Sequence, residues 1–344
     1  MEVYAYRNKL ETTIKSSSGG AFLGIIEELW DNNLNNNVVY GAVFDNELNV
    51  KHDRAIDFIS CEKFCGSKYV QSNMSGIFEK IINDLNGKKR VIFSGTPCQI
   101  YALKNILNRK NINMENLYTI DFICHGTPNP KIWKDYKYWL EKKYKSRLID
   151  FSFRYKGKNL KKNKMAYPIK ACFSNGKIVE DSFYSRLYIQ LFFSRLIYQE
   201  CCYTCKFATL NRHSDITIGD FWCYENVMKK KMSLPLLGMS LILVNTDKGK
   251  NIIEKMKKRA IVENDIYIER CNEKRFLLYQ KDFGSERNKP KNIEKFKDEY
   301  KNLGFEYILR KYAGYNFIGY LKHNIKCVVT FLGILPWISK LYKR

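Results

Sequence analysis

The sequence lacks a run of apolar residues near its N-terminus, which begins MEVYAYR. Export signals need such a run, so we expect no signal peptide and a cytoplasmic protein. The chain contains eleven cysteines. In a reducing compartment these serve as metal ligands or as buried small hydrophobes more often than as disulfides.

Signatures of nucleic-acid-binding folds are also missing, although the formal net charge is +24. The sequence contains no helix-turn-helix, zinc finger or RNA-recognition motif that would position the basic residues against nucleic acid. We therefore expect no nucleic-acid partner. Lysine, asparagine and isoleucine recur throughout the chain, and this general bias accounts for much of the charge. A basic surface would still attract phosphates, acidic proteins or anionic lipid.

The chain has 344 residues and a hydrophobic share of 45%, enough for one large or two modest domains with a sizeable core. The pattern predicts a strand over 90–94, a helix over 99–107 and a second strand over 117–124. Such alternation favours a mixed α/β fold with a partly parallel core sheet flanked by helices. Ligands in such sheets bind beyond the carboxyl ends of the strands, where Cys98 and Cys124 fall.

Periodicity and turn residues predict the other elements. Apolar residues at helical spacing indicate a helix that follows Gly20 and runs to Trp30, and further helices over 74–85, 130–140 and 182–196. The serines at 16–18 offer the first of these an N-cap. Apolar runs and alternation indicate strands over 38–44, 48–50, 149–155, 216–219 and 240–244, with a hairpin turn at Asn175-Gly176. Beyond Thr246 the chain reads as mostly helical and rich in lysine.

The sharpest chemical motif is Cys202-Tyr203-Thr204-Cys205, which brings two thiols to one centre. Taken alone it could be a redox dithiol, half of a zinc site or half of an iron–sulfur site. It follows a helix and precedes a strand, whereas a thioredoxin-like motif opens a helix. Cys98 and Cys124 are single cysteines, and a pair plus two single ligands suits a cluster built into a domain. Cys201 could replace Cys202 as a ligand.

Two further segments could hold a cofactor. Small residues in Ser16-Ser17-Ser18-Gly19-Gly20 would expose backbone amides at a helix start, where phosphate binds favourably. The alternative is an ordinary cap with a tight turn. The turn Gly95-Thr96-Pro97-Cys98 could hold the edge of a cofactor. His125 and His213, two of four histidines, each adjoin a motif, although a lone histidine usually only packs or faces solvent.

Seven ordered segments carry a family resemblance. They are SSSGGAF from Ser16, VVYGAVFD from Val38, GSKYVQS from Gly66, FSGTPCQIYAL from Phe93, DFICHGTPNP from Asp121, FSFRYKGK from Phe151 and CYTCKFATLNRHSDITIGDFW from Cys202. Together they lie within residues 1–225. Through these segments the sequence resembles the coenzyme F420 hydrogenase/dehydrogenase beta-subunit family.

The resemblance implies an FAD-binding oxidoreductase with a 4Fe–4S cluster that passes electrons between cluster, flavin and substrate. It implies Cys98, Cys124, Cys202 and Cys205 as cluster ligands. The flavin candidates are Ser18, Gly19, Gly20, Lys68, Tyr69 and Thr96, with Arg154 and Lys156 as phosphate or substrate contacts. His125 is the candidate catalytic residue. Many bacterial relatives are associated with capsule or exopolysaccharide genes, which suggests a small-molecule or glycan-linked substrate.

One departure from the family concerns the electron donor. Relatives commonly begin with a ferredoxin-like run of cysteines, but the first cysteine here is Cys61. We therefore expect electrons from a separate ferredoxin or from reduced nicotinamide. We also expect a flavin-binding-type segment over 1–87, a family domain with the cysteine cluster over 88–250 and a helical basic extension over 251–344.

The stretch Cys327 to Ile338 is apolar and flanked by lysines and an arginine. It is shorter than the about 20 residues that span a bilayer, but residues 317–344 could lie at the inner face of a membrane. The alternative is a terminal helix packed on the body. For the whole chain, two other functions stay open: a non-redox accessory protein of polysaccharide assembly, and a zinc-containing transferase that binds nucleotide-sugars.

Overall fold

The computed structural model describes residues 1–30, 36–157, 168–228, 237–280 and 289–331. Its strands are β1 (Glu2–Arg7), β2 (Asn37–Phe44), β3 (Val50–Ala55), β4 (Arg90–Gly95), β5 (Leu117–Phe122), β6 (Leu148–Ser152), β7 (Lys170–Phe173), β8 (Ile178–Glu180), β9 (Ile216–Asp220), β10 (Ser240–Val244) and β11 (Tyr267–Cys271). Its helices are α1 (Leu10–Lys15), α2 (Ala21–Leu29), α3 (Ile77–Asn86), α4 (Pro97–Arg109), α5 (Pro130–Tyr144), α6 (Phe183–Phe193), α7 (Asp247–Val262), α8 (Glu273–Leu277), α9 (Ile293–Tyr312) and α10 (Phe317–Phe331).

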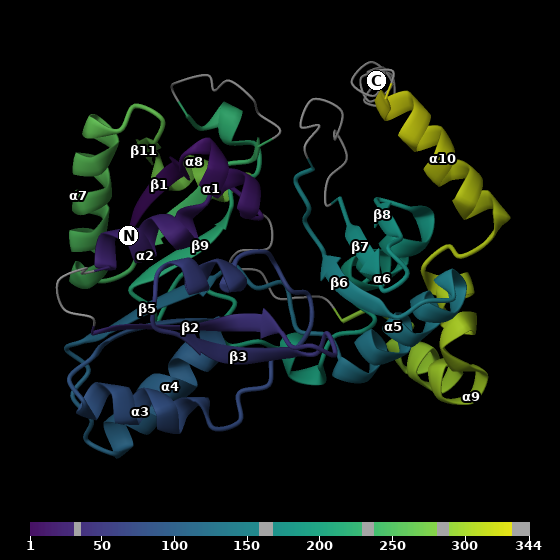
Figure 1. Cartoon of the computed structure of the whole chain (residues 1–344), viewed down its shortest axis with the longest axis horizontal. Helices are drawn as coiled ribbons and strands as arrows, with labels where there is room; N and C mark the ends of the chain where they lie inside the picture. Colours follow the sequence, from purple (N-terminus) through teal and green to yellow (C-terminus); the bar gives the residue numbers. More distant parts are fainter. Residues whose placement is uncertain (31–35, 158–167, 229–236, 281–288, 332–344) are drawn as a thin grey trace.

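The larger of two sheets has eight strands in the order β11-β1-β10-β9-β5-β4-β2-β3. The neighbours β2 and β4, β4 and β5, and β5 and β9 are parallel, whereas the pairs toward both edges are antiparallel. Helices flank this sheet in Figure 1. The predicted α/β fold with a partly parallel core sheet is therefore confirmed.

Both faces of the large sheet are buried, because successive side chains of a strand point to opposite faces. In β2, Val39 packs in the core beneath α2 and α7, while Val38 packs in the core beneath α3 and α4. In β1, Tyr4 faces the first of these cores, and Val3 faces a third core that includes α8. Burial on both faces explains why these strands read as nearly continuous apolar runs.

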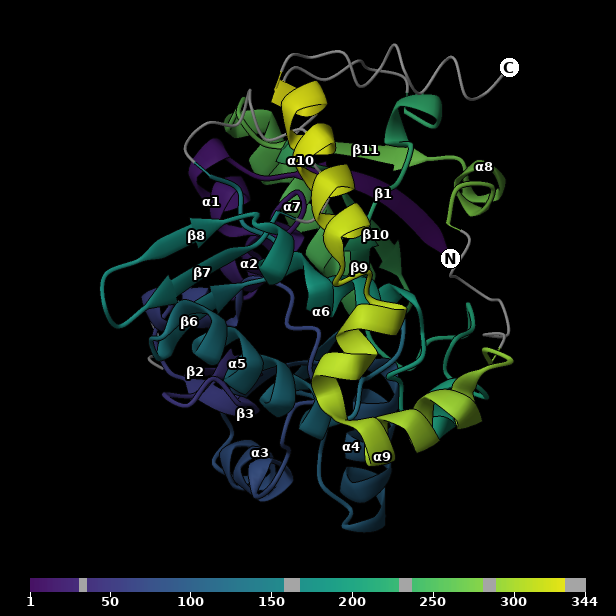
Figure 2. The same ribbon diagram turned by 90° about the vertical axis from the view of Figure 1, so that its right-hand side faces the viewer.

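The smaller sheet, β6-β7-β8, is antiparallel and forms a second lobe with α5, α6 and α9. Figure 1 shows this lobe to the right of the large sheet, and Figure 2 faces it. Its core contains the fully buried Trp133 with aromatic neighbours packed around it, among them Phe151 and Tyr188. The predicted hairpin turn at Asn175-Gly176 joins β7 to β8.

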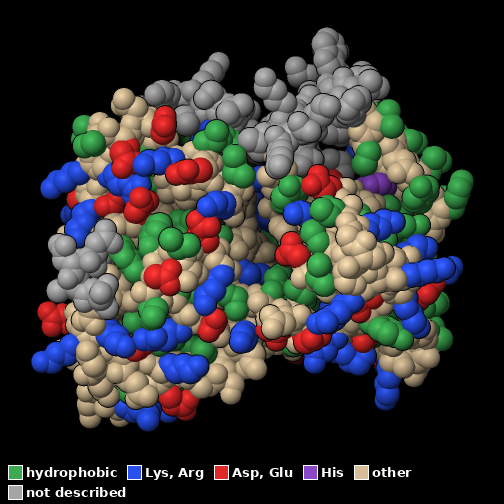
Figure 3. All heavy atoms as spheres, in the orientation of Figure 1, with side chains coloured by type: hydrophobic (Ala, Val, Ile, Leu, Met, Phe, Trp, Pro, Cys, Tyr) green, Lys and Arg blue, Asp and Glu red, His purple; other side chains and the backbone are tan. Residues whose placement is uncertain are grey.

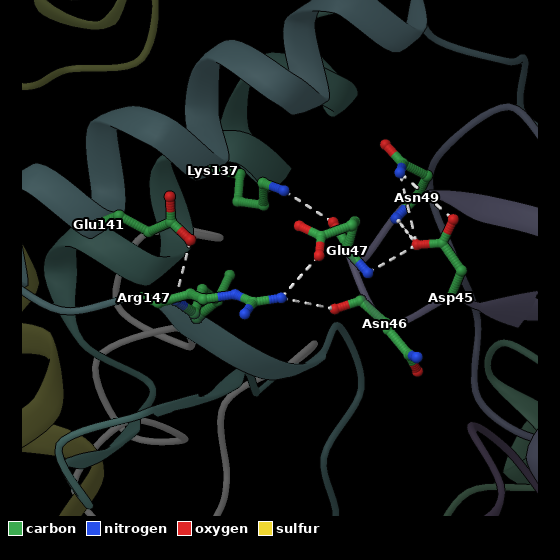
Figure 4. Close-up of polar contacts among 8 residues, drawn as sticks. Asp45, Asn46, Glu47, Asn49, Lys137, Glu141 and Arg147 are labelled. Atoms are coloured by element: carbon green, nitrogen blue, oxygen red, sulfur yellow. Dashed lines mark hydrogen bonds and ion pairs between the residues drawn. The ribbon is translucent and has the colours of Figure 1, made fainter.

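The turn between β2 and β3 reaches from the large sheet to the second lobe (Figure 4). The Glu47 carboxylate accepts a hydrogen bond from Arg147 at 2.7 Å, and Lys137 Nζ donates to the Glu47 carbonyl at 2.7 Å. Trp133 Nε1 donates to the Leu48 carbonyl at 2.6 Å. Side chains of the second lobe thus hold the tip of this hairpin.

One prediction about the start of α2 needs correction. α2 begins at Ala21, directly after Gly19-Gly20 as predicted, but its N-cap is Gly20 with φ 83° and not a serine side chain. The extension over 251–344 is mostly helical where described, but it also contributes β11, which pairs with β1. All three predicted segments thus share one sheet. Within the described residues, none of the helices has the length and apolarity needed to cross a bilayer.

Candidate functional site

Four cysteines from separate parts of the chain line one small pocket. Cys98 lies in the first turn of α4, Cys124 follows β5, and Cys202 and Cys205 lie in and just after the short 3₁₀ helix Glu200–Cys202. The pocket has a volume of about 30 Å³, and its other lining residues are Pro97, Ile123, Thr127, Phe207, Ala208 and Arg212. The structure thus brings together all four cysteines predicted as ligands.

The sheet topology explains half of this convergence. β4 and β5 are parallel neighbours, with Gly95 opposite Asp121. Carboxyl ends of parallel strands meet at the same edge of a sheet. Cys98 and Cys124 each lie within three residues of these ends, so they meet although 26 positions separate them along the chain.

Thr96 fixes the start of α4 and thereby the position of Cys98. The Thr96 amide donates a hydrogen bond to Gln99 Oε1 at 2.9 Å, and the Thr96 side chain completes a capping box. This reciprocal pattern stabilises the first turn of a helix. Thr96 Oγ1 also lies 3.1 Å from Cys98 Sγ. Thr96, a flavin candidate from the sequence, therefore lies beside the cysteine pocket.

The structure distinguishes Cys202 from its neighbour Cys201. Cys201 is exposed and does not line the pocket, whereas Cys202 does. The Thr127 amide donates a hydrogen bond to Cys202 Sγ at 3.4 Å. Burial raises the pKa of the Cys202 thiol to about 12, and a coordinated metal would act in the opposite direction by stabilising the thiolate.

The chemistry of the donor set fits an iron–sulfur cluster. Four cysteine thiolates are the usual ligands of a 4Fe–4S cluster, each on a different iron. Within the described ranges, no group of three or more His, Cys, Asp or Glu side chains is arranged to hold a single metal ion. If a cluster is bound, Cys98, Cys124, Cys202 and Cys205 around this pocket would hold it.

A buried ion pair beside the pocket was not anticipated from the sequence. Arg212 lines the pocket and lies 3.7 Å from the Asp121 carboxylate. Burial raises the pKa of Asp121 to about 6, and the Arg212 charge acts against this rise. The sequence signal that could have revealed the pair is Asp121 itself, a charged residue near the end of a mostly apolar core strand. Such a residue is seldom buried without a partner of opposite charge.

The loop before α2 is packed against β1 and β10. A Cβ atom at Gly19 would lie 2.2 Å from the Tyr6 carbonyl and 2.6 Å from the Ser240 amide, so only glycine fits. Ser18 Oγ donates to the Met239 carbonyl at 2.7 Å. Of the two interpretations of this motif, the serine cap is wrong, because no serine side chain caps α2. Anion binding at the start of α2 stays a prediction, and the buried Ala21 amide there already donates to Ser240 Oγ at 3.4 Å.

Two cations predicted as phosphate or substrate contacts lie next to this loop. Lys156 Nζ donates to the Thr13 carbonyl at 2.8 Å and also to the Ser18 carbonyl. Arg154 forms an ion pair with Asp220, and both side chains are mostly buried. Burial, helped by the Arg154 charge, lowers the pKa of Lys156 to about 7.

Lys68 and Tyr69 belong to the same region. The Ser67 amide donates to Ser17 Oγ at 2.7 Å, which joins their segment to the loop before α2. Lys68 Nζ donates to the Cys65 carbonyl at 2.8 Å, and burial lowers its pKa to about 8. Burial raises the pKa of Tyr69, and the charge of Arg154 opposes this rise. We call Ser18, Gly19, Gly20, Lys68, Tyr69, Arg154 and Lys156 the basic cradle.

A cavity of about 480 Å³ opens beside the basic cradle, which is large enough for a small organic molecule. Lys68 lines it, together with residues of β2, β3 and β6 on both lobes. His125, the candidate catalytic residue, lies next to Cys124, and its ring is 6.4 Å from that of Phe193. His213 instead packs on Tyr101, with ring centroids 4.8 Å apart.

Comparison with known proteins agrees with the fold. A family model for the C terminus of the coenzyme F420 hydrogenase/dehydrogenase beta subunit matches residues 88–267. A chain of the xenon-derivatised F420-reducing [NiFe] hydrogenase complex from Methanosarcina barkeri matches with a TM-score of 0.51 and 13% identity, covering 89% of this chain and 94% of that one. At this identity the likeness concerns the fold. No curated protein matches the sequence. The chain belongs to the coenzyme F420 hydrogenase/dehydrogenase beta-subunit family.

Proposed function

We propose that this protein is an oxidoreductase that binds a 4Fe–4S cluster and FAD and passes electrons between them and a substrate. The observation that carries the proposal is the convergence of Cys98, Cys124, Cys202 and Cys205 on one pocket. Membership of a family named for redox subunits supports it. When bound, such a cluster carries single electrons, and a flavin couples them to hydride transfer.

In this proposal the four cysteines hold the cluster, and the Thr127 amide tunes it. Hydrogen bonds to the sulfurs are among the factors that set the reduction potential of a cluster, and the amide of Thr127 donates to Cys202 Sγ. Cys98 is exposed, so electrons could enter at the protein surface. The donor is a separate ferredoxin or reduced nicotinamide.

The basic cradle would hold the flavin. Its pyrophosphate carries negative charge, and the start of α2 together with Lys156 and Arg154 provides amide and cationic groups within one region. The neighbouring cavity of about 480 Å³ would receive the substrate, a small molecule or a glycan-linked intermediate. His125 is the candidate proton donor or acceptor. A place in capsule or exopolysaccharide synthesis rests on the sequence resemblance alone.

The test is the iron, sulfide and flavin content of the full chain after anaerobic purification. We expect about four irons and one FAD per chain, with the iron lost in Cys202→Ala/Cys205→Ala. The control is Cys172→Ala/Cys223→Ala, which removes two thiols that do not line the pocket and should keep the iron. Equal iron in both double variants would refute the ligand assignment.

The same measurement separates the alternatives. Zinc without iron would favour the zinc-containing transferase. A chain that binds neither iron nor flavin, even after reconstitution, would favour the accessory protein of polysaccharide assembly. Cys201→Ala adds a finer control, because it changes the neighbour of Cys202 that is exposed outside the pocket. This variant should retain a full complement of iron.

A further inference from the structure

α10 lies on the outside of the molecule: it forms the upper right edge in Figure 1 and lies in front of the other elements in Figure 2. One of its faces rests on the N-terminal end of α6. There the Phe183 ring contacts Tyr320 and His323, with ring centroids 5.6 and 5.9 Å apart. Cys327 lies on the same side, with its Sγ 3.5 Å from His323 Nε2. These contacts fix which side of α10 faces the body.

A different face of α10 presents large apolar side chains to solvent. Phe317 is 78% exposed and Ile325 is 54% exposed. Ile318, Leu321 and Val328 are exposed as well. The spacing of the five residues places them all on one side of the helix. Figure 3 shows hydrophobic side chains over α10 at the upper right edge of the molecule. We call these five residues the apolar stripe.

A contiguous stripe of this kind differs from the scattered apolar residues found on most protein surfaces. Single exposed apolar side chains are common and carry no meaning. A continuous exposed patch instead marks a surface that another molecule or a membrane covers. The side of α10 that carries the stripe is turned away from Phe183, so α6 does not cover it.

The charge around the stripe identifies the kind of surface that fits it. Lys322 and Lys326 are exposed and lie beside the stripe on the helix. From Tyr307 to Arg344 the sequence contains lysine and arginine but no aspartate or glutamate. A protein partner for this face would need a complementary acidic rim. A helix with an apolar face bordered by cations alone matches a lipid surface with anionic headgroups.

We propose that α10 binds the surface of an anionic membrane, lying parallel to it. The apolar stripe enters the boundary between headgroups and acyl chains, while Lys322 and Lys326 contact lipid phosphates. The apolar and basic sequence of 332–344 continues this composition but lies outside the described residues. The proposal stands independently of the proposed redox function, because it uses no residue of the cysteine pocket or the basic cradle.

The experiment is co-sedimentation of the full chain with vesicles of phosphatidylglycerol and phosphatidylcholine, or of phosphatidylcholine alone. The wild type should bind the anionic vesicles, and added salt should weaken binding because it screens the lysines. Leu321→Ser/Ile325→Ser keeps the charge but shortens the stripe, and should lower the bound fraction at least about fivefold. Lys322→Gln/Lys326→Gln should weaken binding to anionic vesicles only.

The matched control is Ile261→Ser/Val262→Ser at the end of α7, where two apolar side chains are 79% and 81% exposed. This variant should bind like the wild type. The proposal is overturned if the wild type binds neither vesicle, or if both serine variants bind equally. It is also overturned if size-exclusion chromatography shows a dimer that only Leu321→Ser/Ile325→Ser dissolves, because the stripe would then be an interface between copies.

Discussion

The Arg212 guanidinium lies 3.7 Å from the Asp121 carboxylate, and their side chains are only 3% and 0% exposed. Arg212 Nη1 also donates to the Phe207 carbonyl at 3.2 Å. Phe207 follows Cys205 and lines the cysteine pocket. The pair therefore ties the loop that carries two of the proposed ligands to the end of β5, from which Cys124 follows.

Replacing Arg212 with methionine should strongly destabilise the protein. The Asp121 carboxylate would remain buried without its cation, which typically costs about 3–5 kcal/mol of unfolding free energy. Urea unfolding measures this loss. Arg310→Met, which removes an exposed cation paired with Glu306, should leave the midpoint unchanged. Asp121→Asn/Arg212→Met should lose less unfolding free energy than Arg212→Met alone, because it leaves no buried charge. If Arg212→Met unfolds at the same urea concentration as the wild type, Arg212 does not stabilise the buried Asp121 carboxylate.

Lys156 should make stability depend on pH above neutrality. Burial lowers its pKa to about 7 in the folded chain, whereas the unfolded chain holds the proton up to about pH 10.4. The unfolded state thus binds more protons between these values, so this lysine makes stability rise with pH, by at most about 1.4 kcal/mol per pH unit. Unfolding free energies of the wild type minus those of Lys156→Met should show this rise. If this difference in unfolding free energy does not change from pH 7 to 10, the Lys156 ammonium group is not buried as described.

Bound flavin should suppress the same pH dependence. An anion next to an ammonium group favours its charged form and raises its pKa. With saturating FAD, the wild-type and Lys156→Met curves should therefore run closer to parallel above pH 7. The measurement is the same unfolding series with and without FAD. If FAD binds but leaves the Lys156 contribution unchanged, the flavin phosphates lie away from Lys156.

Gly19→Ala should disrupt the loop before α2. The added methyl group would lie 2.2 Å from the Tyr6 carbonyl, which belongs to a core strand and cannot move away easily. We expect a loss of about 2 kcal/mol or more in thermal or urea unfolding. Gly87→Ala is the matched control, because its methyl group would meet nothing closer than 3.4 Å and its φ is −75°. Equal stability of the two variants would refute the packing.

The contacts in Figure 4 should contribute unequally to holding the β2–β3 turn. Trp133 is buried and donates to the Leu48 carbonyl, so Trp133→Phe should cost about 1–3 kcal/mol through lost volume and an unpaired carbonyl. Arg147 and Glu47 are more than half exposed, and Arg147→Ala should cost less than about 1 kcal/mol. Chemical unfolding of both variants checks the order, and the reverse order would show that the ion pair holds the turn.

Local pattern predicted most elements because each is encoded by near neighbours. The strand and helix on either side of Cys98 are signalled by an apolar run, a turn with proline and a helical period, and they appear as β4 and α4. β11 was missed because its sequence, YIERC, is half polar and lies at a sheet edge. The supposed serine cap failed because Gly20, with a positive φ, fits the entry into α2.

The sequence by itself determined the family, the α/β class and the set of cysteines, since these depend on residue identity and on short-range order. Only the tertiary structure decided that Cys202 rather than Cys201 lines the pocket, that Arg212 faces Asp121, and that α10 carries an exposed apolar stripe. Each of these depends on how segments far apart in the chain pack together. Such packing depends on burial and sheet order, which no local pattern of residues specifies.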